Sequence, residues 1–460
     1  MKEYAHAPHD RQITFTAEIG ERSIRVVSQP GIPLWDQVSP AQRLLGEGVM
    51  LRPGQRVLHL GCGHGALGVA LAKQVPDGSV DLMDASAIAV ALAGATLAAN
   101  NVTNAHILPD PTTLEGEYDA AVVLIPAGRK FARRWLALAH AALRPGGYLY
   151  LAGPKGEGIE SLVRDAKDLC GQASTLAYRE HNRAGIATKR AGVTPPAWAT
   201  EPGIAPGTWH HFTIAAAGHT FAIDSLPGIF SYDRLDEGTA LLIDTLTSPK
   251  SRIPAGGSVL DLGCGYGLLG LVAAAFGAGR IDLVDVNLPA VAATRRNLAA
   301  AGITNARALA GDTFSAVSGE RYDLIVTNPP FHTGKAVDFE SARRFMRESC
   351  DALAPNGQLL LVANAFLPYD QVLRERYRRV EQVAATPRFQ VLRATEPLPP
   401  SSTATTSPTP PTPSPPRPWP AASPPTSAAW SCSPRSPTAS ACTTAPSPGP
   451  SRSTPTPSPP

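Results

Sequence analysis

The chain has 460 residues, of which 43% are hydrophobic and 17% are charged, so it is long and apolar enough for two or three ordinary domains. Its net charge of +3 comes wholly from the last 60 residues, which hold three arginines and no lysine or acidic residue, because positions 1–400 balance at 38 basic and 38 acidic residues. This balance excludes a strongly basic nucleic-acid-binding protein on bulk charge, although it leaves room for a local basic face.

Membrane and metal signals are missing from the sequence. No apolar run approaches the ~18–20 residues of a membrane span, and the polar start MKEYAHAPHDRQ lacks the apolar region of a signal peptide. The six cysteines are scattered without a CxxC pair, which argues against a disulfide framework and against a zinc or other metal site. We therefore expect a cytoplasmic protein.

The chain contains an internal repeat. VLHLGCGHGALG at 57–68 returns as VLDLGCGYGLLG at 259–270, and ALRPGGYLYLAG at 142–153 returns as ALAPNGQLLLVA at 352–363. Three further segments match in the same order between these two. We interpret the pattern as a duplicated domain of roughly 190 residues.

Each copy alternates short apolar runs with Ala-rich amphipathic stretches. In the second copy the predicted strands are SVLDLG, RIDLVDV, YDLIVTN and GQLLLVAN, and the predicted helices between them are LLGLVAAAF, PAVAATRRNLAAAG and FESARRFMRESCDALA. This alternation predicts an α/β fold in which a mostly parallel sheet carries helices on both faces.

The composition also suggests where the domains end. We expect a first copy at 1–190, a polar, Pro/Gly-rich linker at 191–207, a second copy at 208–396 and a tail at 397–460. The tail is Pro/Ser/Thr/Ala low complexity and cannot bury enough apolar surface to order itself. It is either a disordered extension or the frame-shifted end of a GC-rich gene, and the abrupt stop of the ordered pattern after FQVLRATEPL favours the second interpretation.

A glycine loop follows the first predicted strand of the second copy. Gly263, Gly265 and Gly267 let the backbone turn sharply and approach a ligand closely, as only glycine permits without strain. Such a loop is a weak signal alone, because dinucleotide-binding enzymes also use a glycine-rich first turn.

Three acidic residues sharpen the signal of the loop. Asp261 stands immediately before it, Asp285 ends the next strand and Asp312 follows the third strand. A carboxylate at the position of Asp285 can accept hydrogen bonds from two ribose hydroxyls, and Asp312 can meet an adenine amino group. The alternative is that these acids only cap helices or turns.

The most informative residues are Asn328, Pro329, Pro330 and Phe331 at the end of the fourth strand. An amide oxygen and a backbone carbonyl can together orient an exocyclic amine, whose lone pair is delocalised into its ring. Proline holds the carbonyls rigidly, and the aromatic ring offers a stacking surface to a flipped base. The alternative is an ordinary turn after a strand.

Together, the loop DLGCGYG, the acids and NPPF resemble the class I S-adenosylmethionine-dependent methyltransferases. The resemblance implies two tandem Rossmann-like domains, each with a seven-stranded sheet whose last strand is antiparallel. It also implies S-adenosylmethionine as the cofactor, with the ribose on Asp285, the adenine edge on Asp312 and the methionine portion on the loop.

The segments around these motifs narrow the resemblance. GIFSYDRLDEGTALL at 228–242, NPPFHTG at 328–334, VANAFLPY at 362–369 and FQVLRA at 389–394 are similar to the small-subunit ribosomal RNA methyltransferases of type C, and type G of the large subunit shares the arrangement. The family implies methylation of a guanine N2 amine in 16S rRNA (guanine 1207) within the 30S subunit. Alternatives are 23S rRNA or another amine as the acceptor, and a non-enzymatic RNA-binding assembly factor.

The segment that precedes the first strand of the second copy allows two interpretations. Phe230, Asp236 and Gly238 can close over the cofactor, or Asp236 can simply cap a helix.

The first copy has lost the motif that carries the chemistry. It keeps Gly61, Gly63, Gly65 and Asp84, but it has His59 in place of Asp261 and Leu124–Ala127 in place of Asn-Pro-Pro-Phe. We expect this copy to catalyse nothing and, as the family implies, to support folding and RNA binding. The basic runs 129–134, 343–347 and 374–379 are candidate RNA contacts, and because a duplication can replace a homodimer we expect a monomer.

Overall fold

The computed structural model describes residues 12–108, 114, 117–248, 253–329 and 336–399, and side chains of the helix that starts at Ala336 from residue 342 onward. The low-complexity tail predicted at 397–460 lies outside the described residues except for its first three positions.

The second copy is built on a seven-stranded sheet of order β14-β13-β12-β15-β16-β18-β17. The five strands from β14 to β16 are parallel, and β18 pairs antiparallel with both β16 and β17. The strands are β12 (Ser258–Leu262), β13 (Arg280–Asp285), β14 (Ala306–Ala310), β15 (Tyr322–Thr327), β16 (Leu353–Asn364), β17 (Tyr377–Ala385) and β18 (Phe389–Pro397). The predicted seven-stranded sheet with an antiparallel last strand is confirmed.

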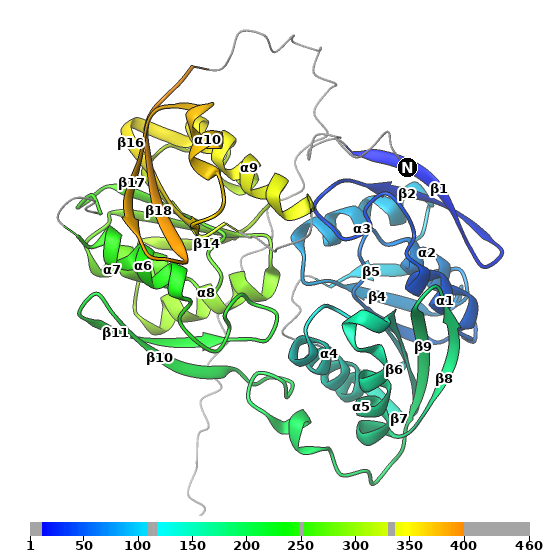
Figure 1. Cartoon of the computed structure of the whole chain (residues 1–460). Helices are drawn as coiled ribbons and strands as arrows, with labels where there is room; N and C mark the ends of the chain where they lie inside the picture. The colour runs from blue at the N-terminus through cyan, green and yellow to red at the C-terminus, as the bar shows by residue number, and fades with distance from the viewer. Residues whose placement is uncertain (1–11, 109–113, 115–116, 249–252, 330–335, 400–460) are drawn as a thin grey trace, which may run out of the picture. The chain divides into compact units, whose positions relative to one another are not determined.

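Helices cover both faces of this sheet, because its central strands are apolar on both sides (Figure 1). In β12, Val259 packs into the core on one face and Leu260 into the core on the other, and both are fully buried. The first core includes side chains of α6 (Glu237–Leu246), α7 (Leu268–Ala275) and α8 (Leu288–Ala300), and the second includes side chains of α9 (Ala336–Ala352) and α10 (Tyr369–Arg374).

The first copy repeats this architecture. Its seven-stranded sheet has the order β5-β4-β3-β6-β7-β9-β8, with β9 antiparallel to both of its neighbours. The strands are β3 (Arg56–Leu60), β4 (Ser79–Met83), β5 (Ala105–Ile107), β6 (Tyr118–Leu124), β7 (Leu143–Pro154), β8 (Gly171–Arg179) and β9 (Asn182–Lys189). The helices are α1 (Pro40–Gly48), α2 (Ala66–Ala72), α3 (Ala87–Ala99), α4 (Arg129–Ala142) and α5 (Ile159–Cys170).

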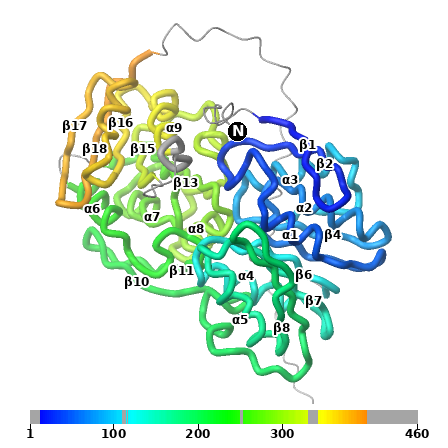
Figure 2. Tube along the Cα trace, turned by 45° about the vertical axis from the view of Figure 1, so that its right-hand side comes forward, coloured from blue at the N-terminus to red at the C-terminus, as the bar shows by residue number. Residues whose placement is uncertain are grey.

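A two-stranded hairpin precedes each sheet, which the sequence did not predict. In the first copy the hairpin is β1 (Ile13–Ile19) with β2 (Arg22–Ser28), and in the second it is β10 (His210–Ala216) with β11 (His219–Ser225). Asn297 on α8 bonds to the backbone of Asp224 in β11, and Thr96 on α3 bonds to the backbone of Val27 in β2. Each hairpin therefore lies beside the equivalent helix of its own copy (Figure 2).

Three short 3-10 helices complete the described secondary structure at Lys155–Glu157, Ala197–Thr200 and Ser315–Val317. Within the residues that the structure describes, no helix is both long and apolar enough to cross a membrane.

Candidate active site

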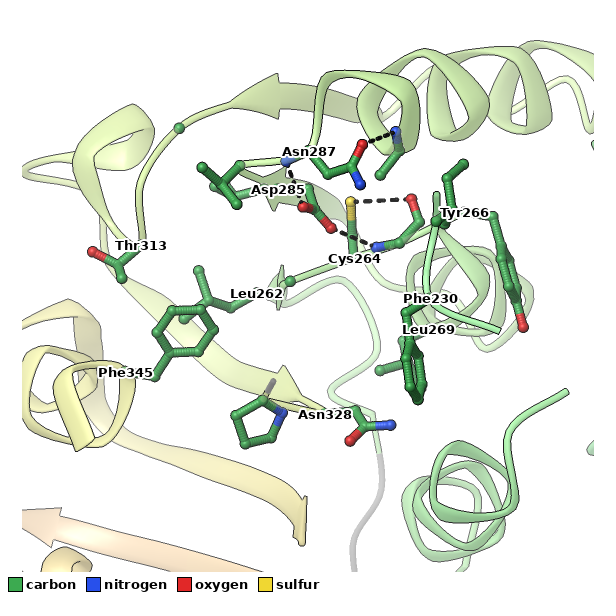
Figure 3. A pocket seen from close by; sticks show the side chains of 18 of the residues that line it. Phe230, Leu262, Cys264, Tyr266, Leu269, Asp285, Asn287, Thr313, Asn328 and Phe345 are labelled. Atoms are coloured by element: carbon green, nitrogen blue, oxygen red, sulfur yellow. Dashed lines mark hydrogen bonds between the residues drawn. The ribbon is translucent and has the colours of Figure 1, made fainter. Parts of the chain in front are cut away.

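A cavity of about 460 Å³ lies at the C-terminal ends of β12, β13 and β15 (Figure 3). The chain runs from β12 outward through β13 to β14 and then crosses back to β15 on the other side of β12, and ligands of open α/β sheets bind at such switch points. Six of the predicted site residues line the cavity, namely Gly263, Gly265, Asp285, Asp312, Asn328 and Pro329.

The glycine loop wraps the N-terminus of α7 at the base of the cavity. Gly263, Gly265 and Gly267 have φ of +75°, +56° and +87°, a conformation that other residues rarely adopt. A Cβ on Gly263 would meet only the ring of Phe345, at 3.7 Å, whereas a Cβ on Gly267 would lie 2.9 Å from the side chain of Thr294. Gly263 therefore leaves room toward the cavity, and Gly267 allows close packing of the loop on α8.

Asp285 joins the loop to the end of the second strand. Its Oδ2 accepts the backbone N–H of Gly265 at 2.8 Å, and its Oδ1 accepts the backbone N–H of Asn287 at 2.8 Å. Burial raises the pKa of Asp285 to about 6, although these backbone donors act in the opposite direction. Two backbone donors thus hold the carboxyl group at the cavity wall.

Asp261 and Gly267 are not among the residues that line the cavity. Asp261 is fully buried, its Oδ2 accepts the backbone N–H of Gly270 at 3.1 Å, and its Oδ1 has no hydrogen-bond partner within the described part of the chain. Burial raises the pKa of Asp261 to about 7. Its contact ties β12 to α7, and its predicted part in cofactor binding stays a prediction.

Asp312 lines the cavity and forms an ion pair with Arg344. Its Oδ2 lies 2.6 Å from Nη1 of Arg344 on α9, and Arg344 also pairs with Glu348 one turn further along. Glu348 in turn accepts the hydroxyl of Thr313 at 2.6 Å. Sequence reasoning placed Arg344 in a candidate RNA-binding run and did not single out Thr313, since only the fold brings α9 to the loop that follows β14.

Asn328 marks the end of β15 at the cavity wall (Figure 3). Its Nδ2 donates to Oδ2 of Asp236 at 3.1 Å and to Oγ1 of Thr239 at 3.0 Å. Asp236 is the N-cap of α6, as one interpretation of the sequence predicted, and it lines the cavity too. Thr239 was not predicted, because no local pattern shows that the start of α6 faces the end of β15. Pro330 and Phe331, the other two predicted catalytic residues, lie outside the described residues.

Cys264 in the loop is buried, as expected of a small packing residue. Its Sγ lies 3.6 Å from Oγ1 of Thr294, and burial raises the pKa of the thiol well above its usual range. A thiol that stays protonated is a poor nucleophile.

Members of each basic run are engaged in ion pairs. Their partners are carboxylates on the same or a nearby element, so these runs are not unpaired cationic patches. Pairs from the three runs are Arg129 and Arg133 with Asp165, Lys130 with Glu201, Arg344 with Asp312, Arg374 with Asp370, and Arg376 with Asp351.

One cavity is lined by the glycine loop, by the carboxylate at the end of the second strand and by the asparagine at the end of the fourth. Comparison with known proteins shows which family has this arrangement. The model of the family described as "Methyltransferase small domain" matches the chain twice, at residues 23–179 and 220–393. The chain belongs to this family.

Similar proteins are described as ribosomal RNA small subunit methyltransferase C. One from Chromohalobacter salexigens is 36% identical over 285 residues, which cover 62% of this chain and 80% of the relative. One from Pseudomonas entomophila is 35% identical over 282 residues, which cover 61% and 80%. The predicted resemblance to the type C methyltransferases is therefore confirmed.

A solved structure from T. thermophilus is also similar to the whole described fold. It matches with a TM-score of 0.70 and 30% identity, and covers 84% of this chain and 98% of its own. It is described as a 16S rRNA N2 G1207 methyltransferase in complex with AdoMet and guanosine. With the family match, this confirms the predicted fold class and S-adenosylmethionine as the cofactor.

The cavity fits that cofactor by its own chemistry. Its volume lies in the range of ordinary cofactor sites, and the open space at Gly263 admits close approach of a ligand to the backbone. Two carboxylates, Asp285 and Asp312, line the cavity together with Leu262, Val284 and Phe345, and this mixture of acidic and apolar groups suits a ribose and an adenine.

Proposed function

We propose that the protein transfers a methyl group from S-adenosylmethionine to the exocyclic N2 amine of a guanine in 16S rRNA. The observation that carries the proposal is the position of Asn328, whose amide stands at the wall of the same cavity as Asp285 and the glycine loop. The similarity to a guanine-N2 methyltransferase with guanosine bound supports guanine as the acceptor.

The loop and the two carboxylates would hold the cofactor. Asp285 would accept the ribose hydroxyls, Asp312 the adenine amino group through the oxygen that Arg344 leaves open, and Gly263–Gly267 would contact the methionine portion. The cofactor supplies a methyl group on a positively charged sulfur. Apolar walls around Phe345 and Leu262 would keep water away from that methyl group.

Asn328 and Pro329 would orient the acceptor. The amine of guanine carries two N–H bonds, and the Oδ1 of Asn328 and the carbonyl of Pro329 would each accept one of them. This fixes the direction of the nitrogen lone pair, so that positioning carries most of the rate. Phe331 would stack on the flipped base, as the sequence predicts for that position.

The first copy would serve RNA binding and folding without catalysis. Its equivalent of Asn328 is Leu124, which cannot accept a hydrogen bond from an amine. We expect the protein to act as a monomer in the cytoplasm on the assembled 30S subunit.

The test is methyl transfer from tritiated S-adenosylmethionine to 30S and 50S particles that lack their native methylations, with Asn328→Ala as the control. Nucleoside analysis of the labelled rRNA should find N2-methylguanosine in 16S rRNA, and the label should disappear with the variant.

Other outcomes separate the alternatives. Label in 23S rRNA would move the proposal to the large subunit and leave the mechanism unchanged. Measurable cofactor binding without label in either particle would contradict the ribosomal substrate and point to another amine, or to a non-enzymatic role in assembly.

A further inference from the structure

The start of α6 holds the amide of Asn328 from one side. Oδ2 of Asp236 accepts three hydrogens: the backbone N–H of Thr239 at 2.9 Å, Nδ2 of Asn328 at 3.1 Å and, at 3.4 Å, the hydroxyl of Thr239. The Oγ1 of Thr239 in turn accepts from the Nδ2 of Asn328 at 3.0 Å. Two acceptors thus hold the NH₂ group of one amide.

This arrangement determines which way the amide of Asn328 points. A carboxylate has acceptors only, so an amide oxygen turned toward Asp236 would be repelled, whereas the NH₂ group is attracted. The Thr239 hydroxyl has one hydrogen, which it directs to Asp236, and it therefore offers only lone pairs to Asn328. The Oδ1 of Asn328 is left on the side away from α6, and it has no hydrogen-bond partner among the described residues.

The carboxylate of Asp236 also affects how well the Oδ1 of Asn328 accepts a hydrogen bond. A carboxylate that accepts from the NH₂ group of an amide polarises that amide, even at the 3.1 Å found between Asp236 and Asn328. Electron density shifts toward Oδ1, which becomes a better acceptor for an N–H. The carboxylate therefore orients the amide and activates its oxygen.

The first copy shows the same helix start without this function. Its N-cap is Ser39, whose Oγ accepts the N–H of Gln42, while Oε1 of Gln42 accepts the N–H of Ser39. This capping box closes on itself, and Leu124 stands at the end of the fourth strand. Capping a helix at this place therefore requires neither an aspartate nor a contact to the strand.

We infer that Asp236 and Thr239 are positioning residues for methyl transfer: they lock the Asn328 amide with its oxygen toward the acceptor amine. This inference rests on the proposed function, because it assigns a partner to the oxygen that Asn328 presents.

The first test replaces each positioning residue by one that keeps the helix start. Asp236→Ser retains an N-cap oxygen, as Ser39 does in the first copy, but is too short to hold Asn328. Thr239→Val removes the acceptor hydroxyl at nearly constant volume. Each variant should lower kcat on undermethylated 30S particles about tenfold while the Kd for S-adenosylmethionine, measured by calorimetry, changes less than twofold.

Two controls accompany these variants. Thr239→Ser, which keeps the hydroxyl, should recover most of the rate that Thr239→Val loses. Ser39→Ala, the matched change of a helix cap in the first copy, should leave kcat within twofold of the wild-type value.

The second test exchanges the two partners. Asn328→Asp alone sets two carboxylates against one another, and kcat should fall about a hundredfold. Adding Asp236→Asn restores an amide-to-carboxylate pair with the opposite polarity, and the double variant should be at least ten times faster than Asn328→Asp. A purely structural Asp236 would instead make the two losses add.

The outcomes distinguish this inference from the proposed function. An active wild-type enzyme whose Asp236→Ser and Thr239→Val variants keep its kcat, or whose double variant is no faster than Asn328→Asp, overturns the positioning role alone. A wild-type enzyme that leaves guanine unmethylated overturns the proposed function, and the inference falls with it.

Discussion

In both copies a glycine loop joins the first parallel strand of the sheet to a helix, and an aspartate on the neighbouring strand receives a loop N–H. The bond runs from Gly63 to Asp84 at 2.9 Å in the first copy and from Gly265 to Asp285 at 2.8 Å in the second. The backbone of a cofactor loop is therefore present twice, and the aspartate serves to hold the loop in both places.

What faces the loop differs between the copies. A Cβ on Gly61 would lie 2.7 Å from the ring of Trp135, whereas a Cβ on Gly263 would find only Phe345, at 3.7 Å. Trp135 and Phe345 are equivalent positions of the repeat. The larger indole packs directly onto the loop of the first copy, in the space that the second copy leaves toward its cavity.

The side chain before the loop differs as well. His59 is fully buried, with Nδ1 against the carbonyl of Val122 at 3.0 Å, and burial lowers its pKa to about 4, so it stays neutral. The second copy has the acidic Asp261 at this place.

The last glycine of the loop has the same packing role in both copies, which explains why the first copy keeps it although we expect no cofactor there. A Cβ on Gly65 would lie 2.7 Å from the backbone of Ala93, just as one on Gly267 would lie 2.9 Å from Thr294. The comparison teaches that the last glycine of this loop is required for helix packing in both copies, so its presence alone does not indicate a bound ligand.

The largest difference in catalytic rate between equivalent changes in the two copies is expected at the end of the fourth strand. Asn328→Ala removes the acceptor for the amine and should lower kcat roughly 10²–10³-fold, the usual cost of losing one transition-state hydrogen bond. The matched change Leu124→Ala in the first copy should leave kcat unchanged. Methyl transfer to 30S particles measures both, and equal losses in the two variants would contradict a single catalytic copy.

Replacing Asp285 should affect the affinity for the cofactor, whereas replacing Asp84 should not. Asp285→Ala removes the ribose acceptor and one anchor of the loop, and should weaken binding of S-adenosylmethionine at least tenfold. Asp84→Ala should leave the affinity unchanged, since we expect the first copy not to bind cofactor. Isothermal titration calorimetry should give one site per chain, and two equivalent sites would contradict the comparison.

Exchanging the aromatic residues at positions 135 and 345 should give the loop of the second copy the tighter packing that is found in the first. Phe345→Trp puts an indole against Gly263 and should weaken cofactor binding about tenfold with little change in Tm. The reverse change, Trp135→Phe, leaves a gap at Gly61 and should cost about 1–2 kcal/mol in the free energy of unfolding. Titration and chemical denaturation measure the two effects, and unaltered cofactor affinity in Phe345→Trp would show that the ring at this position does not control access.

The smallest effect is expected from pH. In the proposed binding mode the ionised form of Asp285 would accept the ribose hydroxyls, so cofactor binding should favour that form, and affinity should fall as pH drops through its pKa of about 6. Between pH 7.5 and 5.5 the loss should be about fourfold. Asp285→Asn should abolish this dependence. If the dependence persists in that variant, it belongs to another group, of which Asp261 is the first candidate because burial raises its pKa to about 7.

Much of the fold followed from the sequence because the signals are local. The apolar runs at the strands, the Ala-rich helices between them and the repeat of the whole pattern predicted two α/β copies. The observed β12 and α8 agree closely with SVLDLG and PAVAATRRNLAAAG. The hairpins were not predicted, since each is a short segment whose stability comes from packing on a helix some 70 residues away.

The sequence by itself determined which residue types could form a methyl-transfer site, because glycine at a loop, aspartate at a strand end and Asn-Pro-Pro-Phe each carry chemistry in their own atoms. Tertiary structure alone decided how they act. It brought Asp236 and Thr239 to Asn328 across 89 or more positions, paired Asp312 with Arg344, and kept Asp261 out of the cavity wall. The physical reason is that hydrogen bonds and desolvation depend on distance in space, and the order of residues along a chain does not specify that distance.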